Sequence, residues 1–472
     1  MINKHIIYIG ILMGIQLYAQ EKVQAPLTLE YCIEMALDNN LDLKKSTLSK
    51  DASQVNFNQS KAALLPTLNA NYNLGVSNGR SIDPYTNDYV DQKLTFSNAG
   101  LNLNFTVFNG FRLLNSIRQR RYSLNAAAME VAEQRQNLIL EVTLTYLQIL
   151  NNRDLLTLAK SRLETTRNQL KRLESLYEEE FGNPADYTDM QGQLALDMTS
   201  VINARNSLKE AKLNLFQLLN TAMDTDVDFV SIPVTDIIKE YPYTADEVFS
   251  DALANMATFK AKQFRLDAAE SGIKAARSGY IPKISLFGQL NTNYSSAAQF
   301  FTETGTSIAE TGGFVTVNGT DYPVLTNETI FFGEDIRYMD QIKNNVYTSF
   351  GVAVTIPLLN GFQSKNNVAL EKIKLESAKI DLQSTTLQFK NAIEQAYIKM
   401  ESALERYHIY KKQSEAFDES FRINEIRFNN GVSNIVAYLT SKNNMDNAMI
   451  NLSNAKYEYL LRVRVLEYYR GV

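Results

Sequence analysis

The sequence predicts a mixed α+β membrane protein built from two tandem repeats, each with two transmembrane β-strands and long coiled-coil helices. Three observations lead to this fold class. Apolar residues recur at seven-residue steps along two stretches of roughly 70 residues, which is typical of coiled coils. Four short stretches alternate apolar and polar residues, which is typical of strands. The same order of elements occurs twice, which indicates an internal duplication.

The composition excludes several classes of protein. The chain has 472 residues, a net charge of −5 and no basic block, which argues against a nucleic-acid partner. One cysteine, Cys32, and two histidines, His5 and His408, exclude an intrachain disulfide and a His/Cys zinc site. We therefore predict no metal and no cofactor. A catalytic triad would depend on His408, which lies in a helical pattern, so we predict that the protein is not an enzyme.

The first 20 residues have the pattern of a secretory signal peptide. A short basic segment precedes the apolar stretch from Ile6 to Leu17, and cleavage is expected after Ala19 or Gln20. The apolar stretch is shorter than the roughly 20 residues that a membrane-spanning helix needs. An uncleaved anchor is the alternative. No later stretch is long and apolar enough to predict a transmembrane helix.

The first repeat is predicted over residues 21–220. A helix should run from Thr28, whose hydroxyl can cap it, to Leu65, because Pro66 follows. Strands are expected at about 66–77 and 98–109. A long helix from about 111 to 181, a turn at Gly182 and a return helix over 189–220 complete the repeat. The seven-residue row of the long helix comprises Ala128, Arg135, Val142, Ile149, Leu156, Leu163, Leu170 and Tyr177, of which only Arg135 is charged.

The second repeat is predicted over residues 244–472, after an equatorial linker at 221–243. A helix over 244–279 should end before Pro282, and strands are expected at about 283–295 and 345–358. A second long helix, a turn at Gly431 and a return helix over 433–469 follow. The polar segment 295–344 between the strands is predicted to be a loop outside the cell, without an assigned role.

Landmarks in the two repeats pair in the same order. The pairs are Ala36-Leu37 with Ala252-Leu253, Pro66 with Pro282, Asn109-Gly110-Phe111 with Asn360-Gly361-Phe362, and Gly182 with Gly431. An Asn-Gly pair alone suggests a hairpin turn. Because a helical pattern follows each pair, we interpret Asn109, Gly110, Asn360 and Gly361 as strand-to-helix junctions in which glycine lets the chain bend.

The four strands have one apolar and one polar face, and no helix is left with a free apolar face to cover them. In a bilayer this pattern places the apolar face toward lipid and the polar face toward water. An open sheet has unpaired edges that lipid cannot satisfy, and four strands are too few to close into a barrel. Two or three copies must therefore share a barrel, and the small polar residues favour the wider, three-copy case. A soluble sheet packed on helices is the alternative.

The chain resembles the TolC-like outer membrane efflux proteins over essentially its whole mature length. The resemblance rests on the duplicated order, the Pro66 and Pro282 strand entries, the Phe-Asn-Gly-Phe and Leu-Asn-Gly-Phe exits, and the helix tips at 177–184 and 427–433. It implies a homotrimer with a twelve-stranded barrel in the bacterial outer membrane and an α-helical tunnel in the periplasm. It also implies docking of a periplasmic adaptor (membrane fusion) protein and an inner-membrane pump.

The same resemblance implies the residues that dock the adaptor. They are the tip glycines and their neighbours, namely Gly182, Asn183, Pro184, Gly431, Val432 and Ser433. Family members often carry an acidic residue six positions after each tip glycine, whereas this chain has Thr188 and Ala437 there. Asp186 and Asp189 flank Thr188 and are candidates for an acidic pore constriction. The alternative is that they only stabilise the start of their helix.

The function expected from this resemblance is that of a passive exit duct for substrates expelled by the pump. Within the family, drug or metal efflux and type I protein secretion both stay open. A structural coiled-coil spacer or adhesin is a further alternative, but it would not need the two-faced strands. A barrel-anchored enzyme would need a convergent catalytic set that the composition lacks.

Overall fold

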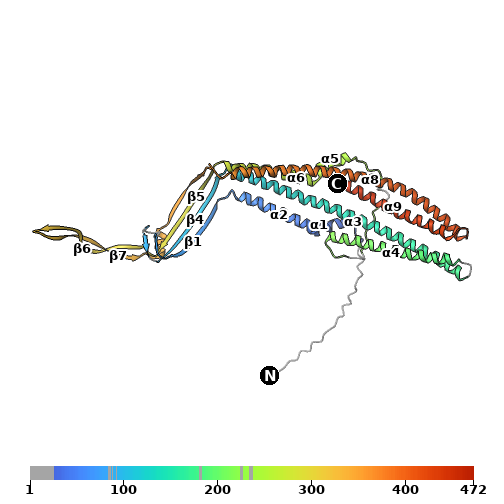
Figure 1. The fold of residues 1–472 in the computed structure, drawn as a ribbon, viewed down its shortest axis with the longest axis horizontal. Helices are drawn as coiled ribbons and strands as arrows, with labels where there is room; N and C mark the ends of the chain where they lie inside the picture. Colours follow the sequence, from blue (N-terminus) through green and yellow to red (C-terminus); the bar gives the residue numbers. More distant parts are fainter. Residues whose placement is uncertain are drawn as a thin grey trace, which may run out of the picture. The chain divides into compact units, whose positions relative to one another are not determined.

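The computed structural model describes residues 26–82, 87, 89–91, 93–179, 183–223, 227–232 and 238–471. The predicted signal peptide and Gly182 lie outside these residues. Two compact units make up the chain: one comprises Met1–Leu48, Met129–Phe259 and Ser384–Val472, and the other comprises Ser49–Ala128 and Lys260–Gln383. The two longest helices, α3 (Arg112–Glu178) and α8 (Gln363–Asn429), contribute residues to both units (Figure 1).

The first repeat contains helices and strands in the predicted order. Its elements are α1 (Leu29–Asn39), α2 (Leu41–Ala62), β1 (Thr67–Ser77), β2 (Arg80–Ile82), β3 (Tyr89–Asp91), β4 (Leu94–Phe108), α3 and α4 (Pro184–Leu219). Strand β4 begins four residues before the predicted start at 98. Helix α4 begins at Pro184 rather than at 189, because Asn183 accepts a hydrogen bond from the Ala185 N–H and caps the helix there.

The predicted single helix over 28–65 is two helices, so that prediction was wrong. Thr28 caps α1, as predicted, by accepting a hydrogen bond from the Tyr31 N–H. The helix then breaks at Asn40, whose backbone is not helical. Asn40 Oδ1 accepts hydrogen bonds from the N–H groups of Asp42 and Leu43, both at 3.0 Å, and so caps the start of α2.

The second repeat breaks its first helix at the matching position. Its elements are α5 (Ala245–Asn255), α6 (Ala257–Arg277), the 3₁₀ turn η1 (Ser278–Tyr280), β5 (Lys283–Ser295), β6 (Gln299–Val317), β7 (Thr320–Asp335), α7 (Tyr338–Asn344), β8 (Tyr347–Thr355), α8 and α9 (Ile435–Arg470). The break between α5 and α6 falls at Met256, 216 positions after Asn40, and Pro282 also follows Pro66 by 216 positions. The duplication therefore extends to the helix breaks.

The segment predicted as a loop over 295–344 is largely ordered, so that prediction was also wrong. It contains β6 and β7, which form an antiparallel hairpin, and the short helix α7. Gly110 and Gly361 are 251 positions apart, whereas Pro66 and Pro282 are 216 apart. The second repeat therefore carries 35 more residues than the first between these landmarks, which is close to the length of the hairpin, Gln299–Asp335.

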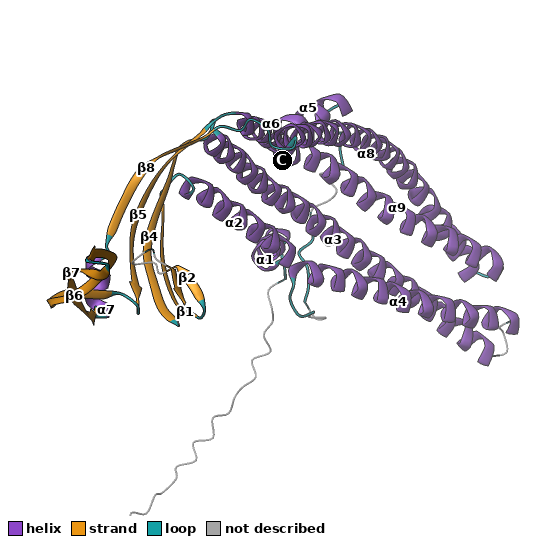
Figure 2. Cartoon of the chain, turned by 60° about the vertical axis from the view of Figure 1, so that its left-hand side comes forward, coloured by secondary structure: helices purple, strands orange, loops and turns teal. Residues whose placement is uncertain are grey.

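The four long strands outside this hairpin form one antiparallel sheet in the order β1-β4-β5-β8 (Figure 2). The two central strands come from different repeats, so the sheet joins the duplicated halves. Strands β1 and β8 are its edges. The small pair β2–β3 is a separate two-stranded sheet.

The unit that contains the helix tips has a core built from the predicted seven-residue row. Val142, Ile149 and Leu156 of that row are buried, whereas Arg135, its exception, is exposed. Nearby, the buried Tyr146 hydroxyl contacts the carbonyl oxygens of Leu27 and Val230, at 2.9 and 2.8 Å. These two contacts connect the described part of the linker with Leu27, near the first described residue. Leu27 also forms an isolated β-bridge with Phe229.

Candidate functional site: a two-faced sheet and the helix tips

The strand register places the apolar residues of the four-stranded sheet in common rows. Leu68 pairs with Leu103, Leu103 with Gly288, and Gly288 with Phe350. On this face Phe350 is 90% exposed. Large apolar side chains on this face are exposed on all four strands; they include Leu68, Tyr72, Leu74, Leu101, Leu103, Leu286, Leu290, Phe350, Val352 and Val354. Such a continuous apolar face needs an apolar environment or a partner.

The opposite face of the sheet is lined mainly by amide and hydroxyl side chains. Asn69 pairs with Asn102, Asn102 with Gln289, and Gln289 with Ser349. Asn102 Nδ2 donates to Asn71 Oδ1 at 2.9 Å across β1 and β4. Within the four strands Lys283, at the start of β5, is the one charged residue. This face is therefore polar but almost free of charge.

Two phenylalanines depart from the predicted division into an apolar and a polar face. Phe96 pairs with Gly75, and Phe287 pairs with Gly351, both in rows of the polar face. A Cβ on Gly75 would lie 2.6 Å from the Phe96 ring, and one on Gly351 would lie 2.8 Å from the Phe287 ring. Each ring thus covers a glycine of the neighbouring strand, which explains why an aromatic residue is accommodated on this face.

Both predicted junctions turn the chain from strand to helix with two consecutive left-handed residues. Gly110 and Phe111 have φ of 64° and 63°, and Gly361 and Phe362 have φ of 59° and 61°. At Gly110 a Cβ would lie 2.7 Å from Ile281 Cβ, so glycine is required for space as well as for conformation. A phenylalanine in this conformation is strained, and its occurrence at both junctions is a further sign of the duplication.

The two asparagines of the junctions hold the first turns of α3 and α8. Asn109 Oδ1 accepts a hydrogen bond from the Leu113 N–H at 3.3 Å. Asn360 Nδ2 donates to Ser364 Oγ at 2.6 Å, and Ser364 Oγ donates to the Gly279 carbonyl at 2.9 Å. The structure therefore gives these residues a role in positioning helices.

The first helix tip is built around the start of α4. Asn183 caps the helix, Pro184 occupies its first turn, and Asn183 Nδ2 also donates to Asp186 Oδ1 at 3.2 Å. Burial, followed by the neighbouring charge of Asp189, raises the pKa of Asp186 above its ordinary value. Asp186 therefore contacts the cap of its helix, and both interpretations of this residue stay predictions.

The second helix tip is a tight turn between α8 and α9. Gly431 has φ of 71°, and the Val432 N–H donates to the Arg427 carbonyl at 2.8 Å, which closes the end of α8. Val432 is exposed, and Ser433 precedes Asn434, the cap of α9. Side chains from both tips pack in one cluster of Leu173, Met190, Phe421, Phe428, Ile435 and Tyr438. The predicted tip residues that the structure describes thus lie beside this packed region, and Asn183, Pro184, Gly431 and Val432 are themselves exposed.

A buried charge cluster next to this region was not predicted from the sequence. Lys442 Nζ lies 3.0 Å from Asp197 Oδ2 and 2.9 Å from Asp446 Oδ2, and all three side chains are at most 1% exposed. Arg162 Nε lies 2.8 Å from the same Asp446 oxygen. Thr166 Oγ1 donates to Asp197 Oδ2 at 2.5 Å. Two cations and two carboxylates balance, so the cluster joins α3, α4 and α9 without net charge.

The surroundings of Asp197 determine its charge state. Burial on its own would raise the pKa of this carboxyl. The hydrogen bond from Thr166 and the charge and hydrogen bond of Lys442 outweigh burial and hold the pKa of Asp197 below its ordinary value. Asp197 is therefore ionised at neutral pH, as an ion pair with Lys442 requires.

The described residues contain no group of three or more His, Cys, Asp or Glu side chains that could hold a metal ion. Cys32 is buried, and burial together with the charge of Glu30 raises the pKa of its thiol to about 11. A thiol with such a pKa is a poor nucleophile and a poor metal ligand at neutral pH. None of the described helices combines the length and hydrophobicity of a membrane span.

Comparison with known proteins gives a match to one family. The model of the family described as "Outer membrane efflux protein" matches residues 32–221 and 248–471. The two matched segments fall on either side of the linker, in agreement with two repeats.

Individual relatives are distant but cover most of the chain. Toxin and drug export protein A of Aggregatibacter actinomycetemcomitans is 24% identical over 447 residues, which are 91% of this chain and 82% of the relative. Outer membrane protein TolC of Escherichia coli K12 is 22% identical over 457 residues, 96% of this chain and 83% of the relative. A crystal structure of CusC superposes with a TM-score of 0.76 at 15% identity, covering 94% of this chain and 92% of that one. At this identity the likeness to CusC shows a shared fold.

Proposed function

Because the chain belongs to the outer membrane efflux protein family, we propose that it is the outer membrane exit duct of a tripartite efflux system. In this proposal it passively conducts substrates that an inner-membrane pump expels through a periplasmic adaptor. The observation that carries the proposal is the four-stranded sheet, with an exposed apolar face and a nearly uncharged polar face. Such a sheet suits a wall between lipid and a water-filled passage.

The edges of the sheet support assembly into a homotrimer with a twelve-stranded barrel. Strands β1 and β8 each pair on one side only, and lipid offers no hydrogen bonds to their free sides. Pairing of β8 of one copy with β1 of the next removes every edge when the ring closes. Three copies supply twelve strands, which leaves room for a passage, whereas eight-stranded barrels are filled by side chains.

Two apolar rows on the helices are exposed, so the expectation from the sequence that no helix has a free apolar face was wrong, and these rows support the same assembly. Leu41, Leu48 and Val55 lie seven residues apart on α2 and are 64%, 68% and 65% exposed. On α8, Ile373, Ile380 and Leu387 have the same spacing and are also exposed. Rows with this spacing are typical of coiled-coil seams, and the described residues leave both rows exposed. Helices of neighbouring copies would cover them and form the wall of the periplasmic tunnel.

The adaptor-docking tips are part of the proposal. Asn183, Pro184, Gly431, Val432 and Ser433 are candidates among the described residues, and Gly182 is a candidate by sequence. Asp186 and Asp189 are candidates for an acidic narrowing at the periplasmic end. The departure at Thr188 and Ala437 means that such a narrowing would depend on the first tip.

The cargo is left open in this proposal. One relative is named for the export of both toxins and drugs, and another, from Pseudomonas putida, is named for toluene efflux. Type I protein secretion is therefore the second candidate function. A coiled-coil spacer or adhesin would leave the two-faced sheet without a purpose.

Two lysine substitutions on β8 test the duct. Val352 points to the apolar face and Ser349 to the polar face of the same strand. In planar bilayers the purified protein should give discrete conductance steps. Val352→Lys places a charge in lipid, at a cost of about 2–4 kcal/mol near the midplane, and should abolish insertion. Ser349→Lys should insert normally and shift ion selectivity toward anions. Absence of conductance in the wild-type protein, or equal effects of the two variants, would refute the duct.

Adaptor docking is tested separately at the second tip. Val432 is exposed and its backbone needs no glycine, so Val432→Asp changes the surface without strain. The variant should form the same assembly as the wild type but bind the cognate adaptor at least tenfold more weakly in a pull-down titration. Ile409→Asp, on an equally exposed side chain of α8, is the matched control. If both variants bind the adaptor like the wild type, the tip assignment is wrong.

A further inference from the structure

The hairpin β6–β7 is an addition to the duplicated plan, and the duct does not explain it. Its strands pair only with each other among the described elements, and it turns at Asn318 and Gly319, both with positive φ. The hairpin contains strands of 19 and 16 residues. A two-stranded ribbon of this length is marginally stable in water unless something packs on it.

The base of the hairpin is held by buried hydrogen bonds. The Gln341 side chain is 1% exposed; its Oε1 accepts from the Ser295 N–H at 2.9 Å. Its Nε2 donates to the carbonyls of Ser295 and Ile336, at 3.0 and 2.9 Å. The Ile336 N–H in turn donates to the carbonyl of buried Ala298. The base of the hairpin is therefore fixed by contacts outside its own two strands.

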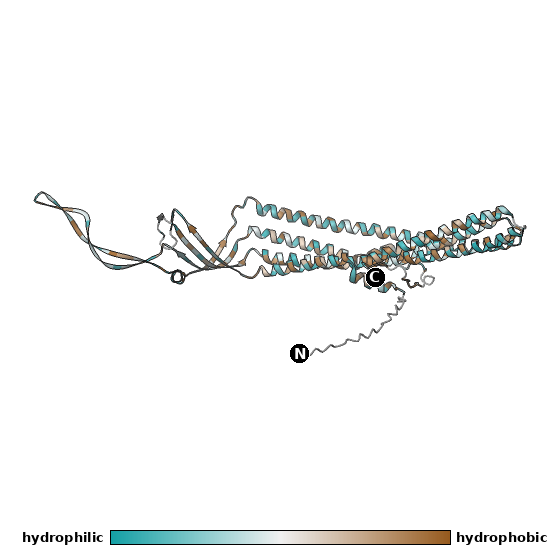
Figure 3. Ribbon diagram, turned by 90° about the horizontal axis from the view of Figure 1, so that it is seen from below, coloured by the Kyte–Doolittle hydropathy of each residue, from teal (hydrophilic) through white to brown (hydrophobic). Residues whose placement is uncertain are grey.

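Hydrophobic residues recur along the hairpin, as the brown segments of its ribbon in Figure 3 show. Exposed side chains occur on both of its faces; they include Phe300, Phe301, Ile308, Phe314, Val315, Val317, Tyr322, Leu325, Ile330, Phe331 and Phe332. A ribbon of two strands cannot bury either face by itself. An exposed apolar surface of this extent indicates a binding site.

The charge of the hairpin limits the kind of partner. Residues 299–335 contain six acidic side chains and no basic one. The acidic residues are Glu303, Glu310, Asp321, Glu328, Glu334 and Asp335. Six like charges disfavour pairing with the hairpin of a second copy, and they disfavour anionic lipid headgroups. They do not converge on a metal site among the described residues. A cationic polypeptide with apolar side chains fits both the charge and the aromatic residues.

One strand of the hairpin offers a regular edge. The register between β6 and β7 shifts twice, and both shifts leave more unpaired residues on β6, namely 304 and 311–313, than on β7. By contrast, every residue of β7 from Leu325 to Asp335 has a partner on β6. Bulges disfavour the addition of a further strand, and a regular unpaired edge favours it. The free edge of β7 is therefore the one to which an extended segment can add.

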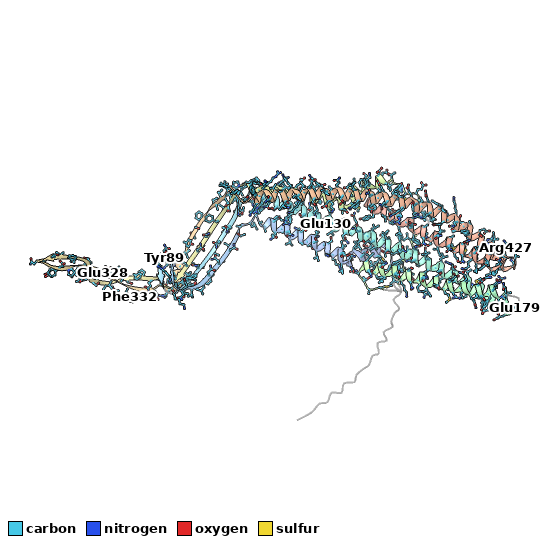
Figure 4. All side chains as sticks on the ribbon, in the orientation of Figure 1. Tyr89, Glu130, Glu179, Glu328, Phe332 and Arg427 are labelled. Atoms are coloured by element: carbon cyan, nitrogen blue, oxygen red, sulfur yellow. The ribbon has the colours of Figure 1, made fainter. Side chains whose placement is uncertain are left out.

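Alternate residues of β7 arrange acidic and apolar side chains in one row. Glu328, Ile330, Phe332 and Glu334 lie two positions apart and so point to one face, and all four are exposed. Figure 4 labels Glu328 and Phe332 on this ribbon. Phe300 lies opposite Glu334 on β6 and adds to the apolar part of this face.

From this row we infer that β7 docks an extended segment of a separate polypeptide with the pattern basic-x-apolar-x-apolar-x-basic. The segment adds to the β7 edge as a third strand through main-chain hydrogen bonds. Its two basic residues oppose Glu328 and Glu334, and its two apolar residues cover Ile330 and Phe332. The partner's pattern follows from this row, because each partner residue on this face lies opposite one residue of β7: the two acidic residues at the ends require basic residues, and the two apolar residues between them require apolar ones.

A labelled peptide with the core Lys-Thr-Ile-Thr-Val-Thr-Lys tests the inference by fluorescence anisotropy with the full-length protein in detergent. It should bind saturably, and the same peptide with both lysines replaced by glutamates should bind at least tenfold more weakly. Glu328→Lys combined with Glu334→Lys should reverse this preference, so that the glutamate peptide becomes the tighter ligand.

Glu303→Lys combined with Glu310→Lys is the matched control. These two residues pair with Phe331 and Leu325, on the other face of the hairpin, and the change in net charge is identical. The control should retain binding of the lysine peptide within about threefold, because its charges do not face the docking row. Equal loss of lysine-peptide binding in the two double variants would show general electrostatic attraction. That result would overturn docking on the row of Glu328, Ile330, Phe332 and Glu334. Absence of saturable binding to the wild type would overturn it as well. Conductance of all variants should equal that of the wild type, so failure of this inference and failure of the duct are distinguishable.

Discussion

Removal of Lys442 tests the buried charge cluster most directly. In Lys442→Met the carboxylates of Asp197 and Asp446 keep only Arg162 as a cation, because Lys442 supplies the other two ion pairs. One negative charge is then buried without compensation. Breaking a buried ion pair in this way costs about 3–5 kcal/mol.

Protonation of one buried aspartate can remove the uncompensated charge. The free energy of this proton uptake gives a second estimate of the stability lost in Lys442→Met. An aspartate with the ordinary pKa of 3.8 takes up a proton at pH 7 at a cost of about 4 kcal/mol, since each pH unit corresponds to about 1.4 kcal/mol. The two values agree. The loss of stability should therefore shrink by about 1.4 kcal/mol for each pH unit below 7 and nearly vanish near pH 4.

Guanidinium unfolding of the full-length protein in detergent, followed by helical circular dichroism at pH 7 and at pH 4.5, measures this loss. The control is Lys379→Met, which removes an exposed lysine 3.4 Å from Glu376 and should change stability by less than about 1 kcal/mol. A loss below 1 kcal/mol for Lys442→Met at pH 7, or a loss that does not depend on pH, would refute the reasoning.

Three further changes have defined outcomes. Folding lowers the pKa of Asp197, so its ionised form stabilises the protein above about pH 3.8, and this contribution is lost as the pH falls below that value. The acid-unfolding curves of Asp197→Asn and the wild type should therefore converge below about pH 3.8. Curves that stay parallel there would contradict this role of Asp197. Tyr146→Phe removes the donor to the carbonyls of Leu27 and Val230 and should cost about 1–3 kcal/mol in thermal unfolding, whereas an unchanged melting temperature would show that water replaces the hydroxyl. Phe362→Gly should stabilise the protein by up to about 1 kcal/mol, because φ is positive and the side chain is exposed, and Phe362→Val should destabilise it; the opposite order would mean that the ring has a contact that outweighs the strain.

The long helices and the four-stranded sheet were predictable because their periodicity is strong. The row through Val142 and Ile149 is buried as its seven-residue spacing indicates, and the alternation of Leu68 with Asn69 matches the two faces of β1. These patterns depend on neighbours in the sequence. The polar face was less predictable, because the placement of Phe96 over Gly75 depends on the register with the next strand.

The helix breaks and the hairpin were missed for local reasons. Asn40 ends a helix without proline or glycine, and its capping bonds are specific to this geometry. In the hairpin, the extra residues at Thr304 and 311–313 interrupt the alternation that reveals a strand. A segment rich in glycine and threonine then has the composition of a loop.

The charge cluster could not be recognised from the sequence. Lys442 and Asp446 are four residues apart on one helix, which is the usual spacing of a pair facing water. Only packing of α9 against α3 and α4 buries them, and that contact joins residues more than 200 positions apart. The candidate tip residues came from the family resemblance, and the described ones lie beside one packed cluster without belonging to it.

The open edges of β1 and β8 also have a genetic consequence. In the proposed ring each copy must pair one edge strand with each neighbour. A single copy whose edge strand cannot pair therefore prevents closure of the trimer that contains it. With equal expression of sound and defective chains that mix at random, only about one trimer in eight would be free of the defect. Edge mutations should therefore be dominant, whereas a null allele should be recessive.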